Sequence, residues 1–89
     1  MATIRIPSAL RQLVQHQSEI DVEAATVRDA ITALEAKHPT IAGKLLADGA
    51  LKPYIRIYVG PDDITALQGL DTAVTARDEI SIIPAIAGG

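Results

Sequence analysis

The segment from Thr26 to Pro39, TVRDAITALEAKHP, has the pattern of one amphipathic helix. Thr26 is a favourable N-cap residue, and Asp29 three positions later completes a pair that resembles a capping box. Pro39 ends the run. Apolar residues at helical spacing form a single stripe, made of Val27, Ala30, Ile31 and Leu34. A helix with one apolar stripe has to bury it, so this segment predicts a helix that lies across a sheet.

Two strands of that sheet are predicted before the helix. Residues 2–7 (ATIRIP) alternate between apolar and polar side chains, and so do residues 18–24 (SEIDVEA). This period of two is typical of half-buried strands. The segment between them, residues 8–17 (SALRQLVQHQ), contains scattered leucine and valine residues. It is either a turn of helix or an irregular arm of a hairpin.

Two further strands are predicted after the helix, at residues 54–60 (YIRIYVG) and 79–86 (EISIIPAI). The motif GPDD at residues 60–63 predicts a turn, because proline presets φ and aspartate side chains bond nearby backbone groups. Residues 40–51 (TIAGKLLADGAL) are predicted to form a short helical turn. Residues 64–78 form a weakly patterned connection.

This order of elements predicts an α+β fold with two layers, one main helix on a mixed sheet of four or five strands. By analogy, an N-terminal hairpin, a crossing helix and a last strand in the middle of the sheet describe the β-grasp, or ubiquitin-like, fold. Short extra helical turns lie between the third and the last strand. We expect a β-grasp domain over residues 1–83 and a flexible C-terminal tail over residues 84–89.

The composition excludes several classes of protein. The 89 residues are 48% hydrophobic and 21% charged, which suits one small domain. Its core must be aliphatic, since the only aromatic residues are Tyr54 and Tyr58. A net charge of -3 without a basic cluster argues against nucleic-acid binding. The absence of cysteine excludes disulfides and thiolate metal sites. With neither a leader pattern nor an apolar run of membrane-spanning length, we expect a soluble cytoplasmic protein that does not bind membranes.

Candidates for catalytic or metal-binding residues are few. His16 and His38 are the only histidines, and their spacing matches no metal site, so both are predicted to be surface residues. The pair Asp62 and Asp63 follows Gly-Pro and is better explained by a turn than by acid–base chemistry. The sequence contains neither a glycine-rich phosphate loop nor a Ser-His-Asp set. It therefore predicts a protein that is not an enzyme, has no catalytic residues and binds no metal or cofactor itself.

Strand alternation places four side chains together on the sheet face opposite the helix: Arg5, Arg56, Tyr58 and Ile83. Such a face is either simply solvated or a docking surface for a partner. Sequence alone gives both interpretations equal weight, because single-helix sheets often present their open face to another protein. We take these four residues as the predicted docking residues.

The sequence ends in a slim segment that follows an apolar strand. The predicted tail consists of Pro84, Ala85, Ile86, Ala87, Gly88 and Gly89. Six extended residues span roughly 20 Å. Because glycine has no Cβ, Gly88 and Gly89 can enter a channel too narrow for other residues. An extended tail can also pair with backbone inside a partner's cleft. It would deliver the α-carboxylate of Gly89 to the bottom of that cleft.

Four stretches together resemble one protein family over nearly the whole chain. They are IRIPSALR (4–11), TVRDAITALEAKHPTIAGKLL (26–46), YIRIYVG with PDD (54–63) and DEISIIPAIAGG (78–89). The chain resembles the small ubiquitin-like sulfur carriers of the ThiS/MoaD type, and most of all the branch that delivers sulfide for cysteine biosynthesis. The final Pro-Ala-x-Ala-Gly-Gly is the most specific part of this resemblance.

The resemblance implies a mechanism and a set of partners. A ubiquitin-activating-type adenylyltransferase, using ATP and Mg²⁺, would adenylate Gly89, and a sulfur donor would convert it to a thiocarboxylate. A synthase carrying pyridoxal phosphate would present an aminoacrylate to this thiocarboxylate, and a metalloprotease would then release cysteine from the tail. Gly88 would give the tail its clearance. The cofactors would belong to these partners.

Other functions remain open at this point. The same carrier chemistry can serve molybdopterin or thiamin thiazole synthesis. The activated Gly89 can instead form an isopeptide bond, as in a ubiquitin-like protein modifier. A different class altogether is a plain β-grasp interaction module whose final glycines are simply a frayed end. A β-grasp ferredoxin is excluded because the sequence has no cysteine.

Overall fold

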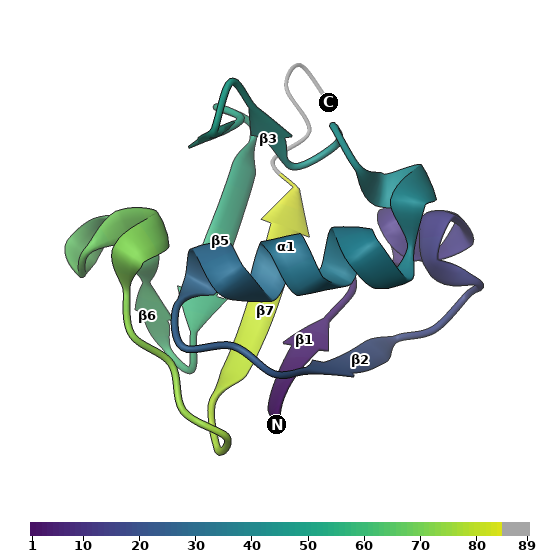
Figure 1. Cartoon of the computed structure of the whole chain (residues 1–89). Coiled ribbons are helices and arrows are strands. Elements are labelled where there is room, and N and C mark those ends of the chain that lie inside the picture. Colours follow the sequence, from purple (N-terminus) through teal and green to yellow (C-terminus); the bar gives the residue numbers. More distant parts are fainter. Residues whose placement is uncertain (85–89) are drawn as a thin grey trace.

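The computed structural model describes residues 1–84, and within them the chain forms one helix layer on a five-stranded mixed sheet (Figure 1). The long helix α1 spans Val27–Lys37. In sheet order, the strands are β2 (Glu19–Val22), β1 (Ala2–Arg5), β7 (Glu79–Pro84), β5 (Ile55–Val59) and β6 (Asp62–Asp63). Both predicted layers are therefore confirmed.

The pairing of the strands gives the β-grasp topology. Strand β1 pairs antiparallel with β2 and parallel with β7, while β7 pairs antiparallel with β5 on its other side. The last strand of the described chain therefore lies in the middle of the sheet, as predicted. Strand β6, of only two residues, pairs antiparallel with the end of β5. It was not predicted as a strand, because two residues are too few to show alternation.

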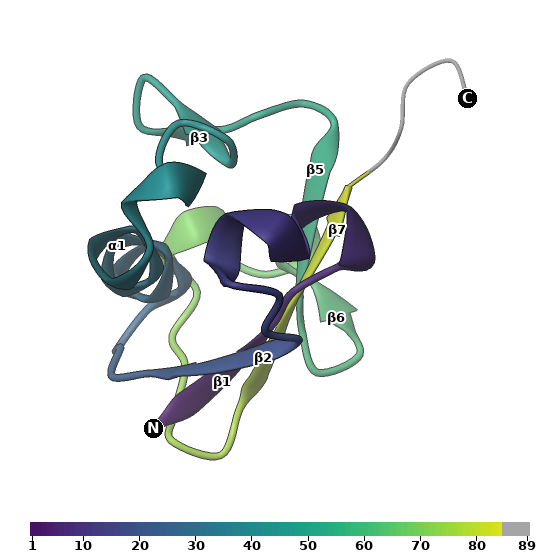
Figure 2. The same cartoon turned by 90° about the vertical axis from the view of Figure 1, so that its right-hand side faces the viewer.

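Helix α1 begins and ends where the sequence predicts. The hydroxyl oxygen of Thr26 accepts a hydrogen bond from the backbone N–H of Asp29 at 3.1 Å, which caps the first turn. His38 is the C-cap residue, immediately before Pro39. The whole predicted stripe is buried, consisting of Val27, Ala30, Ile31 and Leu34. Figure 2 shows α1 on one side of the sheet, with the other face of the sheet left open.

The connections differ from the predictions in detail. The segment after β1 is a 3-10 helix, η1 (Ser8–Val14), so of the two alternatives the helical one is correct. Residues 40–51 contain only the end of a short 3-10 helix, η2 (Pro39–Ile41). They continue into an unpredicted hairpin of strands β3 (Leu46–Ala47) and β4 (Ala50–Leu51).

The β3–β4 hairpin has a physical signal in the sequence. Its loop is Asp48-Gly49, and both residues have positive φ, 55° and 78°. Asp-Gly is a preferred loop for a tight type I′ hairpin turn. The prediction of a helical turn here was wrong beyond Ile41, because leucine spacing was given more weight than this dipeptide. Residues 64–78 form two short 3-10 helices, η3 (Ile64–Ala66) and η4 (Gly69–Asp71).

Pro84 lies in the sheet and not at the start of the tail, where the sequence placed it. It pairs with Ile55 of β5 as the last residue of β7. Pairing between β7 and β1 stops earlier, at Ser81. A proline is tolerated here because only one neighbouring strand remains at this end of β7. The predicted boundary between domain and tail is thus shifted by at least one residue.

The core between α1 and the sheet is aliphatic, as the composition predicts. Fully buried side chains come from every main element, including Ile4 on β1, Leu34 on α1, Ile57 on β5 and Ile80 on β7. Burying an isoleucine or leucine side chain stabilises a fold by about 1.5–3 kcal/mol. Neither tyrosine is fully buried. No helix within residues 1–84 is long and apolar enough to span a membrane.

Candidate functional site

The register of the sheet brings the four predicted docking residues onto one face. Ser81 of β7 lies between Arg5 on β1 and Tyr58 on β5, so these three residues form one row across the sheet. Ile83 lies opposite Arg56 in the next row. Side chains alternate along each strand, and the intervening residues are buried under α1. The four residues therefore share the open face of the sheet.

Arg5 lies within an acidic part of this face. Its guanidinium is 3.5 Å from a carboxylate oxygen of Glu19 and 3.4 Å from one of Glu79. All three side chains are about half exposed, so these ion pairs contribute little to stability. Much of the charge of Arg5 is thereby balanced within the sheet itself, on the side of β7 that faces β1 and β2.

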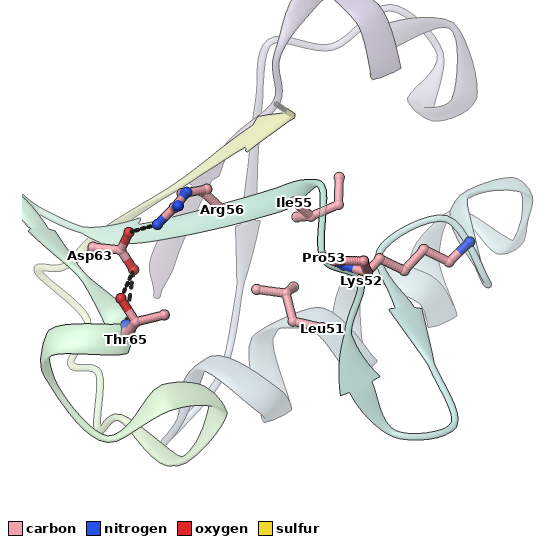
Figure 3. Close-up of a pocket in the computed structure, with 7 residues that line it drawn as sticks. All are labelled: Leu51, Lys52, Pro53, Ile55, Arg56, Asp63 and Thr65. Carbon is pink, nitrogen blue, oxygen red and sulfur yellow. Dashed lines mark hydrogen bonds and ion pairs between the residues drawn. The ribbon is translucent and has the colours of Figure 1, made fainter. Parts of the chain in front are cut away.

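Arg56 is held in place by Asp63. Its Nη1 donates to the Asp63 carboxylate at 3.1 Å. The backbone N–H and the hydroxyl of Thr65 donate to the other carboxylate oxygen, each at 2.9 Å (Figure 3). These hydrogen bonds from Thr65, followed by the interaction with Arg56, lower the pKa of Asp63. Asp63 thus positions Arg56 along the edge of the open face.

The predicted turn at residues 60–63 is only partly correct. Gly60 and Pro61 form the loop between β5 and β6, whereas Asp62 and Asp63 belong to β6. Asp63 also caps η3 by accepting from the N–H of Thr65. Its carboxylate is therefore engaged in structural hydrogen bonds, which agrees with the prediction that this acidic pair has a structural role.

The end of the face near Pro84 is apolar and aromatic. Ile83 is 46% exposed and Tyr54, just before β5, is 44% exposed. Lys52 lies over the Tyr54 ring, with Nζ 5.9 Å from its centroid. Tyr54 was missed among the predicted docking residues. The alternation that selected Arg56 and Tyr58 also applies to Tyr54, two positions earlier.

This end of the face is here called the exit patch, and it consists of Tyr54, Arg56, Tyr58 and Ile83. Strand β7 ends beside this patch, because Ile83 is followed by Pro84, the last residue of the strand. Of the six predicted tail residues, Pro84 is the only one within the described chain. The others, Ala85, Ile86, Ala87, Gly88 and Gly89, lie outside the described residues. Their predicted roles remain predictions.

The histidines and acidic residues form no evident metal site. His16 is exposed after η1, and half-buried His38 ends α1. Within residues 1–84, no three residues among His, Cys, Asp and Glu gather closely enough to hold a metal ion. A cavity of about 280 Å³ lies beside β5, and its wall contains a single ion pair, between Arg56 and Asp63.

Comparisons with known proteins agree with this fold. The model of the ThiS family matches residues 4–89. The sulfur carrier protein CysO of Mycobacterium tuberculosis is 33% identical over 90 residues, covering 98% of this chain and 97% of the relative. Small archaeal modifier protein 3 of Haloferax volcanii is also 33% identical, covering 97% and 96%.

Solved structures show the same fold at full length. In a crystal structure of the Amycolatopsis orientalis BexX/CysO complex, one chain superposes with a TM-score of 0.94 at 31% identity, and the match covers 100% of both chains. These relatives are carriers and modifiers and not catalysts, which confirms the prediction that the chain is not an enzyme. The chain belongs to the ThiS family of small ubiquitin-like sulfur carriers.

Proposed function

We propose that this sulfur carrier bears its sulfur as a thiocarboxylate on Gly89 and donates it for cysteine biosynthesis. The observation that carries the proposal is the match of the family model, which runs through Gly88 to Gly89. The near full-length likeness to CysO proteins supports the cysteine branch over molybdopterin or thiazole synthesis.

The chemistry requires activation before sulfur transfer, because a carboxylate is a poor electrophile. A carboxylate oxygen of Gly89 attacks the α-phosphorus of ATP, and pyrophosphate leaves. Hydrosulfide supplied by a sulfur donor then attacks the acyl carbon and expels AMP, so that the product is the thiocarboxylate with no change in oxidation state. An adenylyltransferase supplies the site for ATP and Mg²⁺, so this chain needs only to present its end.

In the cysteine branch, the thiocarboxylate sulfur adds to an aminoacrylate held by a synthase that uses pyridoxal phosphate. The resulting thioester rearranges to an amide, and a metalloprotease hydrolyses that amide to release cysteine. We place these reactions in the cytoplasm, in keeping with a chain that has no cysteine. The CysO relative that was solved with BexX shows that one such carrier forms a complex.

The exit patch is the proposed docking surface for these partners. Tyrosine and arginine are enriched at interface hot spots, and the exposed Ile83 adds apolar area beside them. The patch lies next to Pro84, the last residue of β7, and this position supports its assignment as the docking surface. Arg5 lies farther along the face among acidic residues and is assigned a lesser role.

The test uses the absence of cysteine from the chain. The protein is purified from its own host under mild conditions, treated with a thiol alkylator and fragmented in a mass spectrometer. Label on Gly89 is expected, and the matched control Gly89→Ala should carry none. Fragmentation is needed because oxidation of Met1 adds nearly the same mass as replacing oxygen by sulfur. An unlabelled terminus, in sulfur-replete cells that contain the adenylyltransferase, would refute the thiocarboxylate.

A protein-modifier role is the second candidate, and the likeness to small archaeal modifier protein 3 favours it. In this case the activated Gly89 would form an isopeptide bond with a lysine of another protein. Extracts of cells that express an epitope-tagged chain would then show conjugates of higher mass. Deleting Gly88 and Gly89 would remove both the conjugates and any thiocarboxylate, while a plain interaction module would be unaffected by the deletion.

A further inference from the structure

The open face carries two arginine residues, and the fold holds them in different ways. Arg5 is 3.5 Å from Glu19 and 3.4 Å from Glu79, and both of these carboxylates are about half exposed. Because glutamate is long and these ion pairs are exposed, neither of them holds Arg5 firmly in one position. Arg56 pairs instead with Asp63, whose side chain is only 17% exposed. The two arginines therefore differ in how firmly the fold fixes them.

The carboxylate of Asp63 is itself fixed by other hydrogen bonds. Its Oδ1 accepts from the backbone N–H and from the hydroxyl of Thr65, each at 2.9 Å, at the start of η3. Its Oδ2 accepts from Nη1 of Arg56 at 3.1 Å (Figure 3). The two hydrogen bonds from Thr65 set the orientation of the whole carboxylate, because both oxygens belong to one rigid group. The start of η3 thus determines where the guanidinium of Arg56 is held.

The sheet places this guanidinium within the exit patch. Asp63 pairs with Tyr58 across β5 and β6, so it lies on the open face, diagonally opposite Arg56. On its other side, Arg56 pairs with Ile83. A guanidinium has five N–H donors, and within residues 1–84 only Nη1 of Arg56 makes a hydrogen bond. Because this side chain is 58% exposed, its other donors are available to a partner.

We infer that Asp63 is a positioning residue for docking: it fixes the guanidinium of Arg56 so that the remaining N–H groups meet an acceptor oxygen of the adenylyltransferase. The inference rests on the proposed function, in which the exit patch receives this partner. Arginine has many rotamers, and ordering such a side chain during association weakens binding. A side chain that is ordered before binding avoids this loss. Asp63 acts through Arg56 and does not itself have to touch the partner.

The variant Asp63→Asn separates this role from the capping of η3. Asparagine is a good N-cap residue, so its side-chain oxygen can still accept from Thr65. Its NH2 group only donates and therefore cannot accept from Arg56. Asp62→Asn is the matched control, because it removes the same charge one position earlier. Asp62 pairs with Val59 and lies on the opposite face of the sheet from Asp63.

The first measurement needs no partner. NMR relaxation of the Arg56 Nε–H group in the isotope-labelled full chain reports how ordered this side chain is. We expect an ordered Arg56 in the wild type and in Asp62→Asn, and an order parameter below about 0.6 in Asp63→Asn. The mobility of Arg5 should be the same in all three proteins, which controls for a general loosening of the face. Equal mobility of Arg56 in the wild type and in Asp63→Asn would overturn the inference.

The second measurement is ATP–pyrophosphate exchange by the adenylyltransferase at varied concentrations of the chain. Asp63→Asn should raise KM roughly three- to tenfold and leave kcat unchanged, because it weakens docking without altering the reacting end. Arg56→Ala should raise KM by about tenfold or more. The double variant should be no worse than Arg56→Ala alone, since Asp63 acts only through Arg56. Asp62→Asn should behave as the wild type does, and circular dichroism checks that each variant is folded.

Each remaining outcome decides between the two proposals. Additive effects in the double variant would show that Asp63 acts independently of Arg56, and would overturn the inference. A lower kcat for Asp63→Asn at unchanged KM would do the same, because it would assign the residue to a step after docking. Normal exchange by the wild type with an unchanged KM for Asp63→Asn would refute the inference alone. A wild-type chain that supports no exchange would refute the proposed function, and this inference with it.

Discussion

At the scale of single residues, the two best-defined side-chain roles are those of Asp63 and Thr26. Asp63 accepts three hydrogen bonds, two from Thr65 and one from Arg56. Thr26 accepts one from the start of α1. Both are structural roles, and each leads to a prediction that a denaturation experiment can test.

Asp63 should make stability depend on pH in the acid range. Its pKa is lowered in the folded protein from the ordinary value of 3.8, so the folded state holds the carboxylate ionised to a lower pH than the unfolded chain does. The stability it contributes is therefore complete above about pH 3.8 and is lost as pH falls through the lowered pKa. Asp63→Asn should lower the urea midpoint at pH 7, with a difference from wild type that shrinks toward pH 2. A constant difference at all pH values would contradict this role.

The cap of α1 gives a second residue-scale prediction. Thr26→Ala removes the acceptor for the Asp29 N–H and should destabilise the fold by about 1 kcal/mol. Thr32→Ala is the matched control, because Thr32 is exposed within the same helix and alanine is the better helix former there. Urea denaturation of the two variants should show a loss for the first and little change or a small gain for the second.

At the scale of elements, α1 and β7 organise the packing, since one covers the sheet and the other forms its centre. Each strand presents one buried and one open side. The same residue type therefore has opposite environments on the two elements: Ile31 of α1 is 1% exposed, whereas Ile83 of β7 is 46% exposed. This contrast allows one substitution to be compared at both sites.

Ile31→Val should cost about 0.5–1.5 kcal/mol, because it removes a buried methylene from a closely packed core. The thermal midpoint should fall by roughly 4–8 °C per kcal/mol for a domain of this size. Ile83→Val, the control, removes the same group from the open face and should change the midpoint little. Equal losses at both positions would mean that the open face is covered in solution.

At the scale of the whole molecule, the open face is divided by β7. Acidic residues and Arg5 lie toward β1 and β2, and the exit patch lies toward β5, next to Pro84. A partner that docks on the patch would thus contact the same end of the molecule from which the chain continues beyond β7.

Ile83→Glu is expected to abolish adenylation of Gly89 while leaving the fold intact, because the side chain is exposed and a carboxylate there would break the apolar contact that we propose with the activating enzyme. Leu67→Glu is the matched control: Leu67 is 45% exposed, lies between η3 and η4 and is not one of the patch residues. ATP–pyrophosphate exchange with the adenylyltransferase measures the effect, and circular dichroism checks the fold. Normal exchange by Ile83→Glu would exclude the exit patch as the docking surface.

The sequence by itself determined the helix, the main strands and the two faces of the sheet, because these depend on local periodicity and capping. The apolar stripe from Val27 to Leu34 and the alternation in the strands gave the order of elements, from which the β-grasp topology was predicted by analogy. Local pattern was insufficient where two signals competed, as where leucine spacing favoured a helix and Asp48-Gly49 favoured a hairpin turn. It was also insufficient where an element had only two residues, as in β6.

Only the tertiary structure decided which residues meet across strands that are distant in the sequence. The register places Ile83 opposite Arg56 and keeps Pro84 in the sheet beside Ile55, which alternation along one strand cannot reveal. Only the folded chain shows that Lys37 of α1 donates to the Asp21 carbonyl at the β2 edge. Long-range pairing depends on how the chain folds back on itself, so the arrangement of the site follows from the assembled sheet.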